Sequence, residues 1–253
     1  MDTIKIDRRN VLMVAHRGLS GLEPENSIPA FVAGGNRSYY GIETDVHVTG
    51  DGKFVTIHDE NTVRTAGDNI NVKTSSTDLI KKICLYNLNE SDRKAGLKGN
   101  DTGKRPDLII PSLADYINIC KKYDKKCILE LKGPFKEEDL ERMVEEIKGL
   151  GYIDGIIFIS FAYQNLVILR KLLADQPLQL LTGVQDQPLS ELIDKLNRHN
   201  LDLDVYCKGL TKEVVDEVHA NNHKVNCWVC DTKEEAEMLI EWGVDFITTN
   251  ILE

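Results

Sequence analysis

Seven charged or titratable side chains stand where this sequence could hold reacting groups, because each follows or ends a β-rich run. They comprise two histidines, three carboxylates, one arginine and one lysine: His16, Arg17, Glu43, Asp45, His58, Glu130 and Lys132. Within a strand, residues two apart point to the same face, so Glu43 lies beside Asp45 and Glu130 beside Lys132. Such a set could bind a metal ion, hold a phosphate and move protons.

The three carboxylates lie within otherwise apolar runs, where an unpaired charge is costly unless something neutralises it. One bound divalent cation would neutralise Glu43, Asp45 and Glu130 together. Ligands that are all oxygen atoms favour a hard ion over Zn²⁺. The sequence therefore predicts that these residues bind one divalent cation, Mg²⁺ or Ca²⁺.

The remaining charges suit phosphate chemistry. Arg17 offers a planar fork of donors for two phosphate oxygens, and Lys132 offers a point charge. Two histidines, His16 and His58, can divide the work of general base and general acid, because imidazole titrates near neutral pH. A cation, two histidines and two positive side chains at one point favour cleavage of a phosphodiester over that of a monoester, which usually uses a dedicated nucleophile.

An alternating series of strands and helices must position these groups. Eight strands are expected, at Val11–Ala15, Gly41–Val46, Lys126–Leu131, Gly155–Ser160, Leu178–Gly183, Asp202–Cys207, Lys224–Val229 and Asp245–Thr249. Amphipathic helices are expected between them, at Leu113–Tyr123, Lys136–Lys148, Tyr163–Leu173 and Leu189–His199, from Thr211 to His219, and after a capping box at Thr232. Eight such units predict a (β/α)8 TIM barrel, whose active site lies at the C-terminal ends of the strands.

Two irregularities follow the second strand. The turn signal Asp51-Gly52 predicts a hairpin whose returning strand is Lys53–Ile57. Residues 60–111 are polar and break the alternation, which indicates an insertion in a single barrel domain spanning residues 1–253. One helix is expected inside this insertion, at Thr77–Leu85.

Composition limits the partners. The 253 residues include 31 Lys and Arg against 41 Asp and Glu, a formal net charge of −10. An acidic chain repels polyanions, so nucleic acid is excluded as a partner. The absence of a long apolar run excludes stable membrane insertion, and no signal peptide is visible at the start, which favours the cytoplasm and leaves a processed precursor open. A homo-oligomer also stays open.

The other reactive side chains have simpler interpretations. The six cysteines are expected to be reduced and mostly buried, and the Cys227–Cys230 C-x-x-C pattern falls on a strand, where its ends face opposite ways. A redox or metal role for that pair is the minor alternative. The four remaining histidines are expected to be structural, three in or beside helices and one, His47, on an exposed turn: His47, His199, His219 and His223.

Several short motifs occur in a fixed order along the chain. They are His16-Arg17-Gly18, Pro24-Glu25-Asn26-Ser27, Ala30-Phe31, Glu43-x-Asp45-Val46, Val55-x-x-His58-Asp59, Glu130-Leu131-Lys132, Ser160-Phe161, Val225-Asn226-x-Trp228 and Gly243-Val244-Asp245. Together they cover nearly the whole chain. This ordered set resembles the signature of the glycerophosphodiester phosphodiesterase family.

The resemblance implies a TIM barrel that hydrolyses glycerophosphodiesters to sn-glycerol 3-phosphate and an alcohol, a reaction of glycerol and lipid metabolism. It implies that His16 and His58 are the acid–base pair and that the three carboxylates bind the metal. Arg17 and Lys132 would hold the phosphate. Trp228 would pack against the glycerol or the alcohol, or else it is an aromatic residue of the barrel mouth without substrate contact.

Several alternatives stay open at the level of sequence. The nucleophile is either the substrate's own glycerol hydroxyl, giving a cyclic phosphate, or water. The function could instead be that of a lysophospholipase D or a phospholipase C-like barrel acting on lipid, or of a non-catalytic ligand-binding barrel. Residues 248–253 depart from the family's usual ending, so contacts from the last loop are undetermined. Glu25 and Asn26 are assigned structural roles, and Asp59 either orients His58 or shapes a turn.

Overall fold

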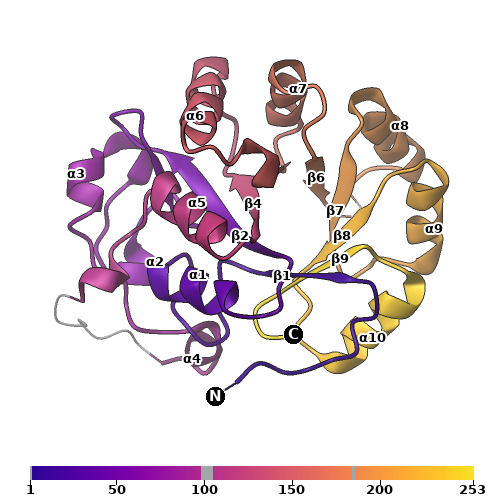
Figure 1. Ribbon diagram of the computed structural model, residues 1–253, viewed down its shortest axis with the longest axis horizontal. Coiled ribbons are helices and arrows are strands. Elements are labelled where there is room, and N and C mark those ends of the chain that lie inside the picture. Colours follow the sequence, from indigo (N-terminus) through magenta and orange to yellow (C-terminus); the bar gives the residue numbers. More distant parts are fainter. Residues whose placement is uncertain (1, 98–104, 184–185) are drawn as a thin grey trace.

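A closed barrel of eight parallel strands forms the centre of the molecule (Figure 1). The structure is a computed structural model that describes residues 2–97, 105–183 and 186–253. The parallel strands are β1 (Leu12–Ala15), β2 (Gly41–Val48), β4 (Lys126–Leu131), β5 (Ile156–Ser160), β6 (Leu178–Thr182), β7 (Asp202–Tyr206), β8 (Val225–Trp228) and β9 (Phe246–Thr249). β1 pairs with both β2 and β9, which closes the barrel.

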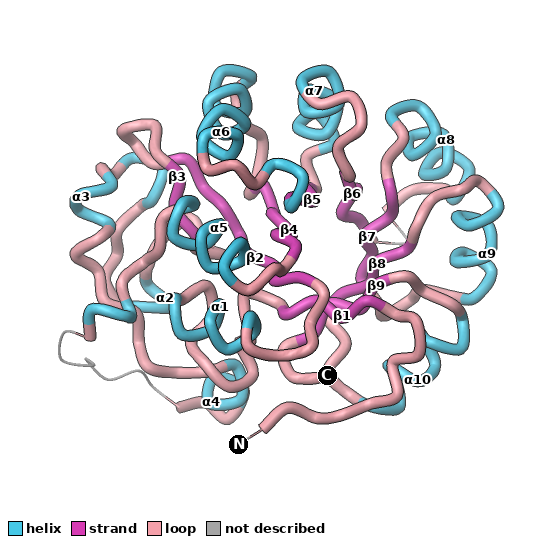
Figure 2. The backbone as a smooth tube through the Cα atoms, in the orientation of Figure 1, coloured by secondary structure: helices cyan, strands magenta, loops and turns pink. Residues whose placement is uncertain are grey.

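Helices surround the strands in a ring, as Figure 2 shows. Those that follow successive strands are α1 (Ile28–Gly35), α5 (Leu113–Lys122), α6 (Glu137–Gly149), α7 (Tyr163–Leu172), α8 (Leu189–His199), α9 (Lys212–Ala220) and α10 (Lys233–Trp242), with a 3-10 turn η3 (Ile153–Gly155) before β5. The predicted (β/α)8 TIM barrel is confirmed, and its strands begin and end close to the expected residues.

Local sequence accounts for where the helices begin. Ser112 caps α5 in a reciprocal capping box with Asp115. At α10 the hydroxyl of Thr232 accepts the N–H of Glu235, but the reciprocal half of the predicted capping box is not formed between these residues. Each helix buries one stripe, so the core between barrel and helices is continuous.

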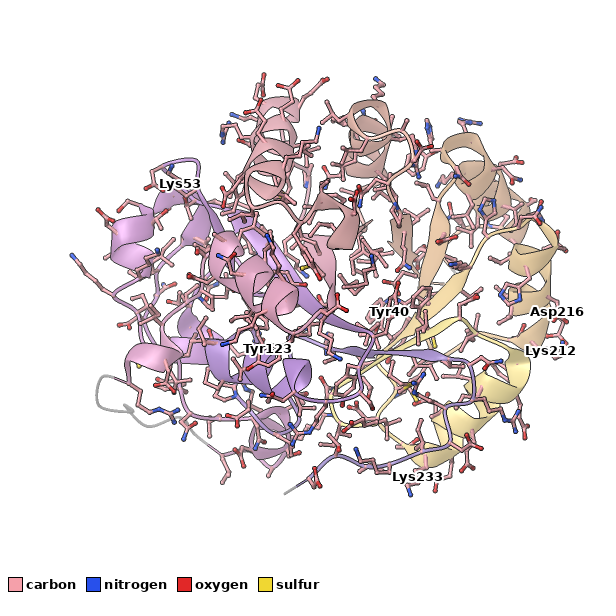
Figure 3. All side chains as sticks on the ribbon, in the orientation of Figure 1. Tyr40, Lys53, Tyr123, Lys212, Asp216 and Lys233 are labelled. Atoms are coloured by element: carbon pink, nitrogen blue, oxygen red, sulfur yellow. The ribbon has the colours of Figure 1, made fainter. Side chains whose placement is uncertain are left out.

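The barrel interior is packed with branched side chains. Inward-pointing residues of several strands form one buried cluster: Val14, Ile128, Ile157, Ile159, Leu181 and Phe246. Tyr40, labelled near the centre of Figure 3, packs against this cluster, with its ring centroid 5.8 Å from that of Phe246. Since Tyr40 precedes β2 and Phe246 begins β9, these rings close the end of the barrel opposite the strands' C-terminal ends.

The expected hairpin is present, because β3 (Phe54–Thr56) runs antiparallel to β2. The segment from β3 to α5 lies beside the barrel and contains α2 (Val63–Ala66), η1 (Val72–Thr74), α3 (Thr77–Ile80), α4 (Glu90–Lys94) and η2 (Pro106–Leu108). It has its own small apolar cluster, which includes Val55, Ile57 and Ile80. Residues 98–104 of this segment lie outside the described residues.

Two local predictions are wrong. The helix expected at Thr77–Leu85 ends at Ile80, because the following chain extends so that Leu85 donates its N–H to the carbonyl of Leu108 and buries its side chain. His47 is not on an exposed turn but in β2, 1% exposed, because the hairpin pairs it with Val55. Burial of apolar side chains and strand pairing therefore override the local signals at both places.

The two ends of the chain lie close together (Figure 1). Ile4 forms a parallel bridge with Leu252, and the carboxylate of Glu253 lies 2.7 Å from Nζ of Lys5. Glu253 also accepts the backbone N–H of Ser38. Among the described residues no helix is both long and apolar enough to cross a membrane.

Candidate active site

All of the predicted site residues except Asp45 line one cavity of about 280 Å³ at the C-terminal ends of the strands, and Asp45 contacts Arg17 and Lys132 of that lining. Its charged side is formed by β1, β2, β4 and the loop after β3: His16, Arg17, Glu43, His58, Glu130 and Lys132. The opposite side is mainly apolar, and it is formed by β5, β6, β8 and the residues that follow them: Ile159, Phe161, Leu181, Trp228 and Val229. Two polar residues, Asp204 and Thr248, complete the lining. The cavity thus has one half for charge and one for apolar substrate groups.

Three buried carboxylates form the centre of the charged half. Glu43, Asp45 and Glu130 each offer an oxygen atom, and these atoms lie within 4.8 Å of one another. Burial, and then the negative charges of Asp45 and Glu130, raise the pKa of Glu43 well above its ordinary value. Burial, and then Asp45, raise the pKa of Glu130 to about 7. Mutual repulsion of this kind is what a bound cation relieves.

Asp45 is held as an anion. Burial by itself would raise the pKa of Asp45, but the charges of Arg17 and Lys132 outweigh burial and lower it. Asn26 donates its side-chain N–H to Oδ2 of Asp45 at 2.8 Å, while Oδ1 has no hydrogen-bond partner among the described residues. Oδ1 lies 3.4 Å from Nζ of Lys132, which also lies 2.9 Å from Glu130. Three adjacent buried carboxylates fit a hard divalent cation.

The turn after β1 brings Arg17 back over the carboxylates. Arg17 has φ of 54°, and its backbone N–H donates to Oε2 of Glu43 at 2.7 Å. Gly18 follows with φ of 75°, and a Cβ there would lie 2.6 Å from the backbone of Ala30. Only glycine permits this approach between the turn and α1. The guanidinium of Arg17 lies 3.1 Å from Glu25 and 3.4 Å from Asp45, so it faces the cavity with its charge partly matched.

His16 is held by the last loop of the barrel. Its Nδ1 lies 2.8 Å from Oδ1 of Asn250, and Ser20 donates to the same oxygen. Asn250 donates its amide N–H to Asp231, which fixes Oδ1 as the atom that faces His16. Nδ1 of His16 must then carry the proton, and Nε2, 4.0 Å from Glu43, keeps its lone pair. Burial, and then the charge of Arg17, lower the pKa of His16 to about 4.

His58 is held differently. Its Nδ1 lies 2.6 Å from Oδ1 of Asp59, and Asp59 is bound by Arg64. Arg64 also donates twice to Glu25, at 2.7 and 2.8 Å. Burial lowers the pKa of His58 below its ordinary value, while Asp59 opposes that shift. Since Glu25 also pairs with Arg17, one chain of ion pairs connects His58 to Arg17.

Sequence reasoning missed several of these partners. Glu25 and Asn26 were assigned to local structure, yet they hold Arg17 and Asp45. Asn250 directly follows β9 at the mouth of the barrel, and a polar residue at that position is the sequence feature that could have indicated a role in the site. Asp204 is a carboxylate between two apolar residues of β7, which is the same signal that identified Glu43. The orientation of His58 by Asp59 is one of the two expected roles of that residue.

The other expectations concern residues away from the cavity. Cys227 and Cys230 are buried, free thiols, and burial raises the pKa of both. His219 and His223 make ordinary structural contacts, with Asp245 and Asn197 respectively. Trp228 lines the cavity and stacks edge-on against Phe161, with ring centroids 5.7 Å apart.

A TIM barrel with a carboxylate cluster, two histidines, an arginine and a lysine at the C-terminal mouth defines a class of protein, the barrel phosphodiesterases. The chain matches the sequence model of the Glycerophosphoryl diester phosphodiesterase family over residues 16–253. It therefore belongs to that family and is an enzyme that hydrolyses glycerophosphodiesters.

Individual relatives agree with this assignment. The chain is similar to glycerophosphodiester phosphodiesterases of Caldanaerobacter subterraneus (30% identical, covering 94% of this chain and 93% of that one) and of Bacillus altitudinis (28% identical, 93% of each). Its fold is similar to that of an Oleispira antarctica phosphodiesterase in complex with the product sn-glycerol 3-phosphate. That comparison has a TM-score of 0.81 and 22% identity, and it covers 94% of this chain and 92% of the other. A Parabacteroides distasonis glycerophosphodiester phosphodiesterase gives a TM-score of 0.77 at 24% identity, covering 95% and 93%.

Proposed function

We propose that the enzyme releases sn-glycerol 3-phosphate and an alcohol from glycerophosphodiesters, with one divalent cation and a histidine pair at the cavity. The observation that carries the proposal is that three buried carboxylates, two oriented histidines and two basic side chains, Arg17 and Lys132, converge at one cavity of about 280 Å³. The product bound to the Oleispira antarctica relative supports the same substrate class.

The cation would be held by Glu43, Asp45 and Glu130. The site offers carboxylate oxygens and no sulfur, which suits Mg²⁺ or Ca²⁺. When bound, the ion would stabilise the negative charge that develops on the phosphoryl oxygens. Arg17 and Lys132 line the same half of the cavity and would bind those oxygens from other directions.

The two histidines have different environments, and these support different roles. His16 is neutral at neutral pH because its pKa is lowered to about 4, and its Nε2 lone pair is free to accept a proton from the nucleophile. His58 has its Nδ1 bound to Asp59, so its Nε2 is left to donate a proton to the departing alcohol. The carboxylate of Asp59 stabilises the protonated imidazole that this step requires.

The apolar half of the cavity would receive the carbon atoms of the substrate. Trp228 lies at the end of β8 and presents its ring beside Phe161, which is 52% exposed. Flat aromatic walls of this kind pack against the carbon skeleton of a small alcohol without requiring further charge.

The decisive experiment measures sn-glycerol 3-phosphate release from a panel of diesters with choline, ethanolamine, glycerol and inositol as alcohols. Each is assayed with Mg²⁺, with Ca²⁺ and with a chelator, beside His16→Ala and His58→Ala. The proposal requires turnover that the chelator and both substitutions reduce by about a hundredfold or more.

Two further substrates separate the alternatives. A diester that lacks the hydroxyl next to the phosphorylated carbon is inert if that hydroxyl is the nucleophile and is hydrolysed if water is. A lysophospholipid turned over faster than every water-soluble diester would assign the cavity to lipid instead.

A further inference from the structure

Asp204 is a buried carboxyl group in the cavity that the proposed reaction does not use. It lies in the middle of β7, is 1% exposed and lines the cavity. Neither of its side-chain oxygens accepts a hydrogen bond from the residues that the structure describes; Oδ1 is enclosed, and the carboxyl group as a whole borders the cavity. A buried acceptor left without a donor is unfavourable, so the arrangement suits a ligand that supplies one.

The neighbours of Asp204 on the adjacent strands do not supply that donor. In the register of the barrel Asp204 lies between Leu181 of β6, which is apolar, and Asn226 of β8. The amide of Asn226 donates one N–H to Gln179 and accepts from Thr248, at 3.1 and 3.2 Å, and no hydrogen bond joins it to Asp204. Within the described residues the carboxyl group of Asp204 therefore has no donor, and the charged group that acts on it is Glu130.

We propose that Asp204 hydrogen-bonds the terminal hydroxyl of the substrate's glycerol, the one farthest from the phosphate, and so selects diesters in which that hydroxyl is free. This inference rests on the proposed function. In this arrangement the phosphate lies against Arg17 and Lys132, and the terminal hydroxyl of the glycerol lies against Asp204.

The chemistry of the alternatives favours this hydroxyl. The other glycerol hydroxyl is on the carbon next to the phosphorylated one, so it must stay in the charged half. A quaternary ammonium group has no N–H and cannot donate a hydrogen bond to the carboxyl group. An acyl ester at the terminal position has no donor either, and a site built to bind a hydroxyl discriminates strongly against analogues that lack it.

The test compares glycerophosphocholine with 2-hydroxypropyl phosphocholine, which keeps the hydroxyl next to the phosphorylated carbon and lacks the terminal one. In the wild type we expect kcat/KM to favour glycerophosphocholine by about ten- to a hundredfold. Asp204→Leu should lower kcat/KM for glycerophosphocholine more than that for the other substrate, by about the same factor, so that the preference disappears. Asp204→Asn keeps a polar group of the same shape and should retain part of the preference.

Asp202→Asn is the matched control. Asp202 lies on the same strand outside the cavity, where it accepts the backbone N–H of Lys224, and the variant should keep the wild-type preference. A preference that survives in Asp204→Leu, or that Asp202→Asn also abolishes, overturns the assignment.

A binding measurement separates this inference from the proposed function. Calorimetry with sn-glycerol 3-phosphate and with propane-1,2-diol 1-phosphate needs no turnover. If the wild type hydrolyses no diester, the proposed function fails, whereas a binding preference that depends on Asp204 still supports the hydroxyl contact. Equal binding of the two phosphates by wild type and Asp204→Leu overturns it.

Discussion

Nδ1 of His58 lies 2.6 Å from Oδ1 of Asp59, and this contact is the first in a series that ends at Arg17, which also lies on the charged side of the cavity. Asp59 binds Arg64, Arg64 binds Glu25, and Glu25 binds Arg17. The proposed acid and a proposed phosphate ligand are thus held by one network. Its members come from the loops after β1 and β3 and from α2, which explains how the segment beside the barrel supports the site.

Asp59→Asn should change the pH dependence of the reaction. An asparagine can still accept from Nδ1 of His58, but its neutral oxygen favours the protonated imidazole less than the carboxylate of Asp59 does, while the larger opposing charge of Asp45 remains. The pKa of His58 should therefore fall further, and less of the proposed acid is protonated at neutral pH. We expect the alkaline limb of the kcat profile to move to lower pH and kcat at neutral pH to fall by about tenfold.

Glu60→Gln is the control for this change, because Glu60 is the next residue and pairs with Lys73 away from His58. It should leave the profile as in the wild type. An alkaline limb that stays in place in Asp59→Asn would show that Asp59 does not support proton donation.

Asn250→Ala should reduce kcat more than it changes KM. The substitution removes the acceptor that fixes the proton on Nδ1 of His16, so the imidazole is free to turn or to take the other tautomer. We expect kcat to fall by about ten- to a hundredfold, since the contribution of a positioned base depends on its geometry. Steady-state kinetics at saturating metal ion measures this.

Ser20→Ala is a matched comparison, because Ser20 donates to the same Oδ1 of Asn250 but does not touch the imidazole. Its loss removes one hydrogen bond and leaves His16 oriented. Equal losses of kcat in Asn250→Ala and Ser20→Ala would argue that the loop, and not the tautomer of His16, is what matters.

Glu25→Gln should destabilise the fold as well as the site. Glu25 is 4% exposed and contacts Arg17, Arg64 and Arg93. The neutral variant leaves Arg93 without this ion pair and removes one of the two anions that Arg17 and Arg64 each contact. Removal of one partner of a buried ion pair costs about 3 kcal/mol of unfolding free energy. Urea denaturation at neutral pH measures the difference, with the exposed Glu237→Gln as the control.

The same carboxylate predicts a dependence of stability on pH. Burial alone would raise the pKa of Glu25, but Arg64 and Arg17 outweigh it and lower that pKa from 4.5 to about 2. A lowered folded-state pKa stabilises the fold above the unfolded value of 4.5, and this contribution is lost as pH falls towards about 2. The difference between wild type and Glu25→Gln should therefore shrink in acid. A difference that is the same at low and neutral pH would contradict this account.

Much of the fold follows from local pattern. Ile156–Ser160 and its counterparts are short apolar runs with helix signals between them, and such runs form parallel strands wherever both faces are covered. The pattern fails at Leu85 and His47. There, a small separate cluster and a returning hairpin strand decide the structure, and neither is visible in a local window.

The site residues could be predicted where a reactive side chain stands at the end of a predicted strand. Glu43 and Glu130 could be recognised because a carboxylate in an apolar strand demands a partner. Asn250 could not, because its role depends on which residue of the first strand lies beside the last one after the barrel closes. Glu25 likewise forms ion pairs with Arg64 and Arg93 only because the segment beside the barrel brings these two residues close to it.

Metal binding should release protons, and its affinity should increase with pH. The pKa of Glu43 is raised, and that of Glu130 is raised to about 7, so without a cation these groups bind protons that a metal ion must displace. Affinity for Mg²⁺ or Ca²⁺ should rise as pH increases through about 7, where Glu130 loses its proton. Calorimetry in two buffers of different ionisation enthalpy counts the protons released.

Glu130→Gln tests the assignment, because it removes the group that titrates near neutral pH and one proposed ligand. The variant should bind the cation about tenfold more weakly or worse, with a flatter pH dependence, and the ion should raise its melting temperature less than that of the wild type. Glu146→Gln is a fitting comparison, since Glu146 lies on α6, outside the cavity, and burial also raises its pKa. Unchanged affinity in Glu130→Gln, or binding without proton release in the wild type, would remove Glu130 from the metal site.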